Sequence, residues 1–427
     1  MASRRIPLAD HVADATALLA GTLGALPVPL GAAAVGRVAA QELRSPLDVP
    51  AADVSQMDGY AVRAADLPAV GEEVTLPLGG MIAAGDLPGE LAPGTARAIM
   101  TGAPVPAGAD LVVPVEESAA GRFVLGGSGS ADGADGGTGS VTLTPLETGP
   151  GRFVRPRGSA TRRGDTILRE GQVLTPGRIA HLAACGAREV EARTPPRVLV
   201  LSTGSEVAPA GGDPGPGRTH DANGPGLAAA LAEAGAEVVA TAAVPDDPAL
   251  LLERLHAELG RTDADLIVTS GGVSQGAREV VRMAAQHADV TLAFPTLSLQ
   301  PGGPQGIGTL LHEGRRVPWI ALPGNPVSAL LSCELILRPA LGAPPRRRLR
   351  LPLRLEDPSR PEPSPAHLLQ HRRARVLPSG QVRLVGGPGS HLVAALAAAD
   401  ALVAVPAGTD LLHDGDLVET ILLTEGS

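Results

Sequence analysis

Hydrophobic and polar positions vary along the chain in a way that divides it into stretches of different character. Residues 7–20 and residues 33–43 carry apolar side chains at helical spacing, so both are expected to be amphipathic helices. Between residues 70 and 144, short apolar pieces are separated by Gly and Pro, which predicts a β-rich module. Residues 154–186 then return to strand-then-helix patterning. We therefore expect the β-rich module to be inserted into a first domain built from both flanks.

The middle of the chain alternates buried strands with helices as far as about residue 340, the pattern of an open, mostly parallel sheet in a three-layer α/β/α domain. A polar loop follows each predicted strand. Ligands bind beyond the carboxyl ends of the strands in such sheets, so these loops are expected to share one binding edge. The strands are predicted at 197–201, 237–243, 266–268 and 317–322.

The pattern changes again after residue 344, and short alternating pieces between 369 and 423 predict a small C-terminal β domain. The basic run Arg346–Arg350 is expected to be a solvated linker, and the low-complexity segment 126–140 a mobile loop. The fold class is thus a multidomain α/β protein. The predicted boundaries are 1–46 with 145–194 for the split first domain, 47–144 for the inserted β-rich domain, 195–342 for the α/β domain and 343–427 for the C-terminal β domain.

A short glycine motif follows the third of these strands. Ser270-Gly271-Gly272 leads into helical spacing from Ala277 onward. A helix start leaves backbone N–H groups free, and the helix dipole favours an anion there. Glycines also let a ligand approach the backbone closely. A tight turn without a ligand is the alternative, but the neighbouring polar strand ends favour a binding site for phosphate or another anion.

Composition excludes several classes of function. The net charge of −10 argues against nucleic acid as a partner. No apolar run approaches the ~18–20 residues that a membrane span needs, and the N-terminus lacks the continuous apolar region of a signal peptide, so we expect a cytoplasmic protein. Cys185 and Cys333 lie in apolar helical contexts, which predicts buried thiols rather than a disulfide framework or a zinc site. All 35 basic residues are arginine, because the chain contains no lysine.

A series of motifs resembles the molybdopterin molybdenumtransferases, the family that includes the gephyrin E domain. One such match is weak, but the ordered set spans nearly the whole chain and is specific. The motifs are GRVAAQEL at 36–43, LDVPAADVSQMDGYAVRAAD at 47–66, IMTGAPVPAGAD at 99–110, VLSTGSEV at 200–207, DAN at 221–223, SGGVSQG at 270–276, LPGNPVS at 322–328 and GSH at 389–391.

The resemblance implies an enzyme of molybdenum cofactor biosynthesis. Adenylylated molybdopterin is bound, the adenylate is cleaved off with the help of Mg²⁺, and molybdate is inserted at the dithiolene, which gives molybdenum cofactor and AMP. The resemblance also implies four subdomains and an elongated homodimer with a shared cleft.

The resemblance further assigns roles to individual residues, and their chemistry fits those roles. Carboxylates hold Mg²⁺, while N–H, O–H and guanidinium groups bind oxyanions. Taken singly, each carboxylate is about as compatible with a solvated surface position or a helix cap as with a functional role. The implied catalytic residues are Asp58, Thr101, Glu206, Asp246 and Glu279; the metal ligands are Glu206 and Asp221; the substrate-binding residues are Ser270, Gly271, Gly272, Ser274, Pro323, Gly324, Asn325, Pro326, Arg373 and Ser390.

Some positions depart from the family's pattern. The usual Lys-Pro-Gly-Lys-Pro segment reads Gln300-Pro-Gly-Gly303-Pro304 in this chain. The usual Gly-Glu-Asp reads Gly158-Ser159-Ala160, so Ser159 and Ala160 replace the two acidic residues. Glu279 stands where the family usually has Asp. A charged partner contributes ~1.5–3 kcal/mol to binding an anion, so two lost lysines weaken oxyanion binding by orders of magnitude. The alternative function is therefore a catalytically weak paralogue that acts as a molybdopterin- or cofactor-binding module.

Overall fold

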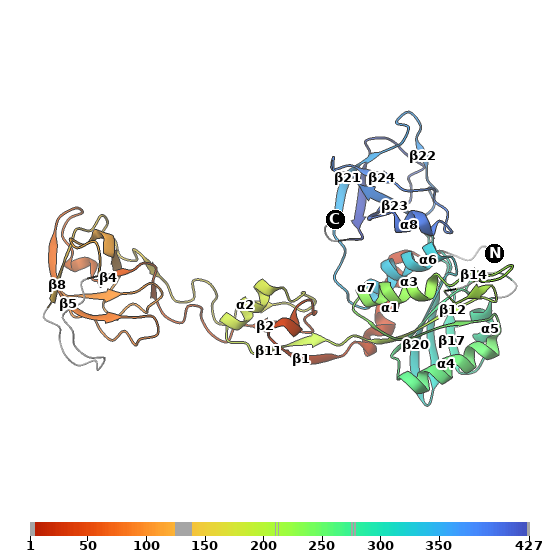
Figure 1. The fold of residues 1–427 in the computed structure, drawn as a ribbon, viewed down its shortest axis with the longest axis horizontal. Helices are drawn as coiled ribbons and strands as arrows, with labels where there is room; N and C mark the ends of the chain where they lie inside the picture. Colours follow the sequence, from red (N-terminus) through yellow and green to blue (C-terminus); the bar gives the residue numbers. More distant parts are fainter. Residues whose placement is uncertain are drawn as a thin grey trace. The chain divides into compact units, whose positions relative to one another are not determined.

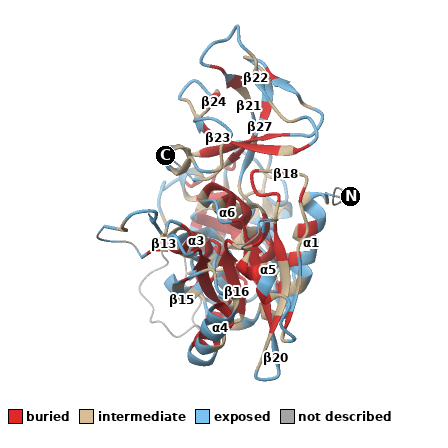
Figure 2. Cartoon of the chain, turned by 90° about the vertical axis from the view of Figure 1, so that its right-hand side faces the viewer, coloured by how far each residue is buried: buried red, intermediate tan, exposed pale blue. Residues whose placement is uncertain are grey.

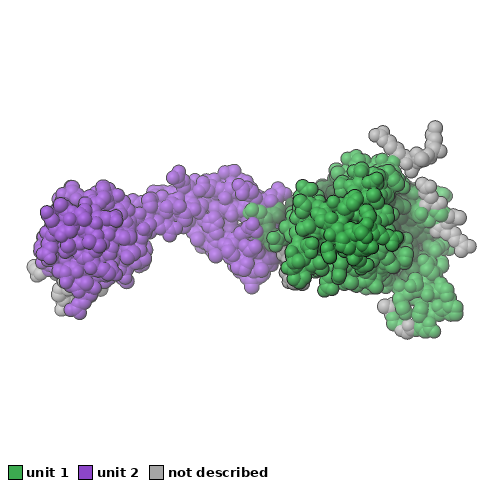
Figure 3. Space-filling model, turned by 90° about the horizontal axis from the view of Figure 1, so that it is seen from above, with its two compact units in different colours: residues 1–26, 171–173, 191–427 green, residues 27–170, 174–190 purple. Residues whose placement is uncertain are grey.

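The computed structural model of the chain describes residues 5–123, 139–209, 211, 213–274, 276 and 279–424 (Figure 1). They form two compact units (Figure 3). Unit 1 comprises residues 1–26, 171–173 and 191–427, and unit 2 comprises residues 27–170 and 174–190. Residues 126–138 of the segment expected to be a mobile loop lie outside the described residues. No helix among the described residues is long and apolar enough to cross a membrane.

Unit 1 is built on a six-stranded sheet with the order β15-β12-β16-β20-β19-β17. The neighbours from β15 to β20 are parallel, while β19 and β17 are added antiparallel at one edge. The expected mostly parallel sheet is therefore confirmed. Its strands are β12 (Arg197–Thr203), β15 (Glu237–Val244), β16 (Leu266–Ser270), β17 (Val290–Ala293), β19 (Gly306–His312) and β20 (Arg315–Leu322).

Helices cover both faces of this sheet, because successive side chains of each strand point to opposite faces. Val198 and Val200 of β12 pack in one buried cluster, and Leu199 and Leu201 pack in the other. Helices α1, α3 and α6 contribute to the first cluster and α4 and α5 to the second, so the buried strands lie between two helical layers (Figure 2). These helices are α1 (Leu8–Leu19), α3 (Asn223–Glu233), α4 (Pro248–Thr262), α5 (Val280–Ala284) and α6 (Pro326–Ser332), which continues through the π-helical turn η5 (Cys333–Leu337) into α7 (Arg338–Ala340).

The two cysteines are free and buried, as predicted. Cys333 lies in η5 within the first core cluster, where burial raises the pKa of its thiol to about 12. Cys185 caps the C-terminal end of helix α2 (Pro176–Ala184). A thiol held neutral in an apolar core is a packing residue rather than a nucleophile.

The C-terminal part of unit 1 is a small closed barrel. Its strands run in the order β18-β23-β24-β21-β27-β25, and a further pairing of β23 with β25 closes the ring. β18 lies in the loop between β17 and β19 of the α/β sheet, so this loop is joined to the barrel by backbone hydrogen bonds. The barrel elements are β18 (Leu299–Gln300), β21 (Arg348–Arg354), β23 (Leu369–Val376), β24 (Val382–Leu384), β25 (Ala401–Val405) and β27 (Leu417–Leu422), with the short pair β22 (Glu362–Pro363) and β26 (Leu411–Leu412) and helix α8 (Val393–Ala397).

The expectation that Arg346–Arg350 forms a solvated linker is wrong. Arg348 and Arg350 belong to strand β21, which pairs with β27. Arg346 donates to both carboxylate oxygens of Glu334 at 2.9 and 3.1 Å, and its side chain is only 11% exposed. Partners that are distant in the sequence thus make Arg348 and Arg350 part of a barrel strand and pair Arg346 with Glu334.

Unit 2 contains a five-stranded sheet with the order β7-β4-β6-β5-β8. Further strand pairs join residues that precede this sheet in the chain to residues that follow it. The strand pairs fit the expected insertion, while the four predicted domain boundaries stay a prediction. The elements are β4 (Gly59–Val62), β5 (Val74–Ile82), β6 (Ala96–Ile99), β7 (Leu111–Pro114) and β8 (Gly139–Leu143), with the pairs β1 (Ala25–Pro29) and β11 (Glu189–Arg193), β2 (Leu43–Arg44) and β10 (Thr166–Leu168), and β3 (Val54–Ser55) and β9 (Val154–Arg155).

The helix expected at residues 33–43 does not form. Only the 3-10 turn η2 (Ala32–Ala34) is helical, and Gly36 has a φ of +80°. The N–H of Gly36 donates to the carbonyl of Leu174, and the N–H of Leu174 donates to the carbonyl of Arg37. Because these distant partners take the backbone groups that a helix would use internally, tertiary pairing overrides the helical spacing.

Candidate active site

A cavity of about 1130 Å³ lies at the carboxyl ends of β12, β15, β16 and β20 in unit 1. Loops from the barrel and the segment around β18 complete its wall. Gln300 and Gly303, at the two positions where the resemblance implies lysines, also line it. The predicted site residues that line this cavity are Glu206, Asp221, Asp246, Gly271, Gly272, Ser274, Glu279, Pro323, Gly324, Asn325, Pro326 and Ser390.

The glycine turn after β16 has a different structure from the one expected. Helix α5 begins only at Val280 and has five residues, so the turn does not open a helix. The N–H groups of Ser274 and Gly276 donate instead to the carboxylate of Glu279, at 2.8 and 3.1 Å. The side chain of Glu279 therefore organises the loop and occupies donors that were expected to be free for an anion.

Gly271 of this turn and Gly324 of the loop after β20 are needed for packing. A Cβ on Gly271, whose φ is +96°, would lie 2.5 Å from the hydroxyl oxygen of Thr203. A Cβ on Gly324 would lie 3.3 Å from the Cα of Gly271, so the loops after β16 and β20 touch backbone to backbone. Ser270 itself is fully buried at the end of β16. The turn thus shapes the cavity floor, and its close approach is to the protein's own backbone.

Asp221 is the most fully bonded carboxylate of the cavity. Its Oδ1 accepts hydrogen bonds from the hydroxyl of Ser202 at 2.9 Å and from the N–H groups of Asn223 and Gly224 at 3.0 and 2.9 Å. The side-chain amide of Asn223 in turn donates to the carbonyl of Gly324 at 2.8 Å. This network fixes the start of α3 against the ends of β12 and β20, which places the motifs of three separate segments around one point.

Asp246 and Glu206 differ in how they are held. Asp246 accepts from the N–H of Ser205 at 3.2 Å, and its own N–H donates to the Ser205 hydroxyl at 3.1 Å, so it joins the loops after β12 and β15. Glu206 is exposed beside them, and its carboxylate takes part in none of the hydrogen bonds or ion pairs found among the described residues. Of the cavity carboxylates, Glu206 is therefore the one whose charge is free for a ligand.

The cavity does not hold a complete metal site made of protein groups alone. Among the described residues, no group of three or more His, Cys, Asp or Glu side chains is placed to hold a metal ion. Mg²⁺ keeps several waters and typically uses one or two carboxylates together with substrate phosphates. Glu206 and Asp221 fit that lesser requirement, since both line the cavity and one carboxylate is unengaged.

Arg373 lies behind the cavity wall rather than in it. Its side chain is 2% exposed, and its guanidinium donates to the carbonyls of Gly389, at 3.0 Å, and Gly387. The same loop presents Ser390 to the cavity, and the carbonyl of Ser390 accepts from the N–H of Val327 at 3.3 Å. Arg373 thus contacts carbonyl oxygens of this loop, while its expected contact with an oxyanion stays a prediction.

Asp58 and Thr101 lie together in unit 2. The carboxylate of Asp58 accepts from the N–H and the hydroxyl of Thr101, at 2.7 and 2.8 Å. These hydrogen bonds lower the pKa of Asp58, the backbone N–H having the larger effect. Asp58 is therefore held ionised, and the pair predicted from distant motifs forms one local unit.

Arg5 is a cavity residue that sequence reasoning missed. It belongs to an arginine-bearing N-terminal segment with no motif, and composition gave no reason to single out one arginine among 35 basic residues. Only tertiary pairing of the N-terminal segment with the loop around residue 297 brings it to the cavity.

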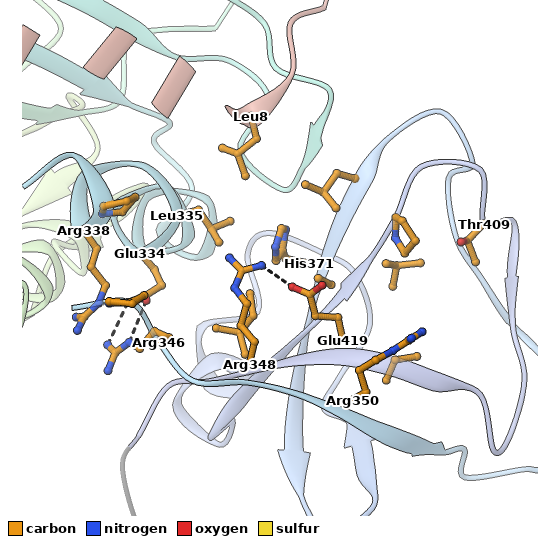
Figure 4. A pocket seen from close by; sticks show the side chains of 18 of the residues that line it. Leu8, Glu334, Leu335, Arg338, Arg346, Arg348, Arg350, His371, Thr409 and Glu419 are labelled. Carbon is orange, nitrogen blue, oxygen red and sulfur yellow. Dashed lines mark hydrogen bonds and ion pairs between the residues drawn. The ribbon is translucent and has the colours of Figure 1, made fainter. Parts of the chain in front are cut away.

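A second cavity of unit 1, of about 840 Å³, lies between α1, η5 and the barrel (Figure 4). Arg346 bonds to Glu334 on one side of it, and Arg348 pairs with Glu419 on the other (Figure 4). His371 of β23 also lines this cavity and is 4% exposed. Burial, and next the nearby Arg348, lower the pKa of His371 to about 4.

The buried neutral imidazole of His371 predicts a pH dependence of stability. An unfolded His titrates near 6.5, so below that pH the unfolded chain binds a proton that the folded chain excludes. The contribution of His371 is therefore fully present above pH 6.5 and is lost as the pH falls toward 4, by up to about 1.4 kcal/mol per pH unit. Urea unfolding of wild type and His371→Gln at pH 7, 6 and 5 checks this. Parallel stability profiles for the two proteins would contradict it.

Three family models match successive parts of the chain. They are the MoeA N-terminal region (domains I and II) over residues 6–186, a probable molybdopterin-binding domain over 199–343 and the MoeA C-terminal region (domain IV) over 359–423.

Relatives match over most of their length. Molybdopterin molybdenumtransferase 2 of Mycobacterium tuberculosis is 40% identical over 395 residues, which cover 87% of this chain and 89% of the relative. Molybdopterin molybdenumtransferase 1 of the same organism is 32% identical over 92% of this chain and 94% of the relative. Two solved molybdopterin biosynthesis MoeA proteins of Pyrococcus horikoshii superpose with TM-scores of 0.74 and 0.72, at 27% and 23% identity, over 99% and 98% of this chain and 100% of each relative.

Proposed function

Because the chain belongs to the molybdopterin molybdenumtransferases, enzymes of molybdenum cofactor biosynthesis, we propose that its unit 1 cavity binds adenylylated molybdopterin and replaces the adenylate with molybdate. One observation supports this most directly. The segments at 200–207, 221–223, 270–276 and 322–328 are far apart in the chain, yet all contribute to the wall of one cavity. That cavity combines backbone and hydroxyl groups with carboxylates, as a phosphoanhydride substrate requires.

The residues have distinct roles in this proposal. Glu206 and Asp221 hold Mg²⁺, which would supply Lewis-acid polarisation of the phosphoanhydride. Glu279 and Asp246 hold their loops in place through the hydrogen bonds they accept, and the Asn223–Gly324 bond fixes the wall opposite. Asp58 and Thr101 remain proposed catalytic residues, supported by the ionised state of Asp58.

The reaction gives a direct test. Purified protein, adenylylated molybdopterin, molybdate and Mg²⁺ should release AMP at a rate proportional to the protein concentration. Glu206 and Asp221 are proposed to contact the substrate phosphates only through a bound divalent ion. Excess EDTA should therefore stop the release of AMP, and added Mg²⁺ should restore it. AMP formation no faster than in buffer would overturn the proposed function.

The alternative is a binding module without efficient turnover. The lysine positions are occupied by Gln300 and Gly303, and the acidic positions by Ser159 and Ala160. The relatives are named as enzymes, and the comparisons do not favour this alternative. It predicts stoichiometric binding of adenylylated molybdopterin by equilibrium dialysis, with AMP release at the level of buffer alone.

A homodimer in the cytoplasm is also proposed, on the family resemblance. Sedimentation velocity at micromolar concentration would show a single species of twice the 42.9 kDa chain mass. A monomer under those conditions would count against the dimer and against any cleft shared between chains.

A further inference from the structure

The loop at residues 300–304 is the place where this chain lacks the two lysines that the family resemblance implies. Gln300 cannot replace one of them, because its amide oxygen accepts a hydrogen bond from Gln370 of the barrel at 2.7 Å. Gly303 has no side chain at all and is buried in the cavity wall. The loop therefore presents no charge of its own to the cavity.

The N-terminal segment is fixed beside this loop. The N–H of Ile6 donates to the carbonyl of Thr296 at 3.0 Å, and the N–H of Ser298 donates to the carbonyl of Ile6 at 2.8 Å. Arg5 adds a hydrogen bond from its Nη1 to the carbonyl of Leu297, also 3.0 Å long. These contacts hold the Arg5 side chain in a set position although its residue is exposed.

The guanidinium of Arg5 lies beside residue 303, within contact distance of a side chain built there. A Cβ built on Gly303 would be 3.5 Å from Nη1 of Arg5. Among the described residues that line the cavity, Arg5 is the only arginine, and the chain contains no lysine. The same cavity contains four carboxylates, so an anionic substrate needs a cation to offset them. They belong to Glu206, Asp221, Asp246 and Glu279.

We propose that Arg5 is the oxyanion-binding cation of this cavity and takes the place of the missing lysines. The inference rests on the proposed function and adds a substrate-binding residue to it. A guanidinium has five N–H donors in a planar fork, and only the donor on Nη1 is used by Leu297, so the others can bind a tetrahedral oxyanion. That oxyanion is molybdate or a phosphate group of the adenylylated substrate, which share this chemistry.

The replacement is chemically consistent with the departure at residue 303. The family resemblance implies a cation on the loop itself, whereas here the cation comes from a segment about 300 residues earlier in the chain. The loop at residues 300–304 carries no charge of its own that would compete with the guanidinium for the anion.

Substitutions at both positions test the proposal. Arg5→Gln should raise the KM for molybdate or for adenylylated molybdopterin by about 10- to 100-fold, because a charge-assisted hydrogen bond is lost. Gly303→Lys in the Arg5→Gln protein should recover most of the loss. A side chain fits there, since its Cβ would be 3.5 Å from Arg5 Nη1 and from the carbonyls of Leu297 and Leu299, which are ordinary contact distances. Arg360→Gln, at an exposed arginine outside the cavity, is the matched control.

The outcomes separate the possibilities. A change confined to the KM for molybdate identifies molybdate as the ligand of Arg5, and a change confined to the KM for adenylylated molybdopterin identifies a phosphate. Equal KM values for wild type, Arg5→Gln and Arg360→Gln would overturn the role of Arg5 while leaving the enzyme activity intact. If the wild type releases no AMP, titration calorimetry with molybdate and with adenylylated molybdopterin still decides the matter. Unchanged affinities in Arg5→Gln would then refute the inference.

Discussion

Glu206→Gln is expected to lower the rate of AMP release by about 100-fold or more and to leave thermal stability unchanged. The carboxylate is exposed in the cavity and is not engaged by any hydrogen bond or ion pair among the described residues. Its charge therefore contributes little to folding and is available for a metal ion. Glutamine keeps the size and one oxygen of the side chain, so a loss of activity reports the loss of charge.

Steady-state AMP release and a thermal melt of the same protein measure both halves of this prediction. Glu237→Gln is the matched control, because Glu237 is exposed at the amino end of β15, away from the cavity. Asp221 gives a useful contrast: its Oδ1 accepts three hydrogen bonds, so Asp221→Asn should lower activity and stability together. Full activity of Glu206→Gln at limiting Mg²⁺ would show that Glu206 is not a metal ligand.

Arg346→Ala is expected to destabilise unit 1 by about 3 kcal/mol, since it leaves the largely buried carboxylate of Glu334 with only the longer 3.7 Å contact to Arg338. Arg346 bonds in bidentate fashion to Glu334, whose side chain is 16% exposed, and pairs with Glu233 at 2.7 Å. This pairing joins α3 and η5 to the chain entering the barrel. A loss of that size lowers Tm by roughly 6–12 °C in a unit of this size.

Differential scanning calorimetry measures this effect. Arg347→Ala is the control, because Arg347 is the exposed neighbour and its loss should change stability by less than about 0.5 kcal/mol. A double variant, Arg346→Met with Glu334→Met, should regain part of the stability, since the bidentate pair is then removed whole while only Glu233 and Arg338 each lose a partner. An Arg346→Ala transition as high as that of Arg347→Ala would show that the pair contributes nothing.

Strand and core positions of the α/β layers could be predicted from the sequence because their physical causes are local. Runs such as Leu266–Val268 are apolar at every position, which only a strand covered on both faces can satisfy. The structure extends this strand to Ser270 and buries all of it. The alternation of Arg and Leu in RLRLPLR also matched a strand, but its charge led to the wrong expectation of a solvated linker.

Elements that depend on distant partners could not be predicted in this way. Residues 33–43 have helical spacing, yet Leu174 takes the backbone groups of Gly36 and Arg37. The helix expected from Ala277 onward begins at Val280, and Glu279 directly before it bonds back to the loop. In both cases the competing partner contributes hydrogen bonds that the local pattern does not reveal.

The sequence by itself determined the family, the layered α/β core and the set of residues that meet at the carboxyl edge of the sheet. Only the tertiary structure decided what each of them does there. Asp221 and Glu279 are engaged by backbone donors, Glu206 is free, Arg373 is buried behind the wall and Arg5 is brought into it. The physical reason is that a charge acts through its surroundings, and those surroundings are assembled from segments up to about 300 residues apart.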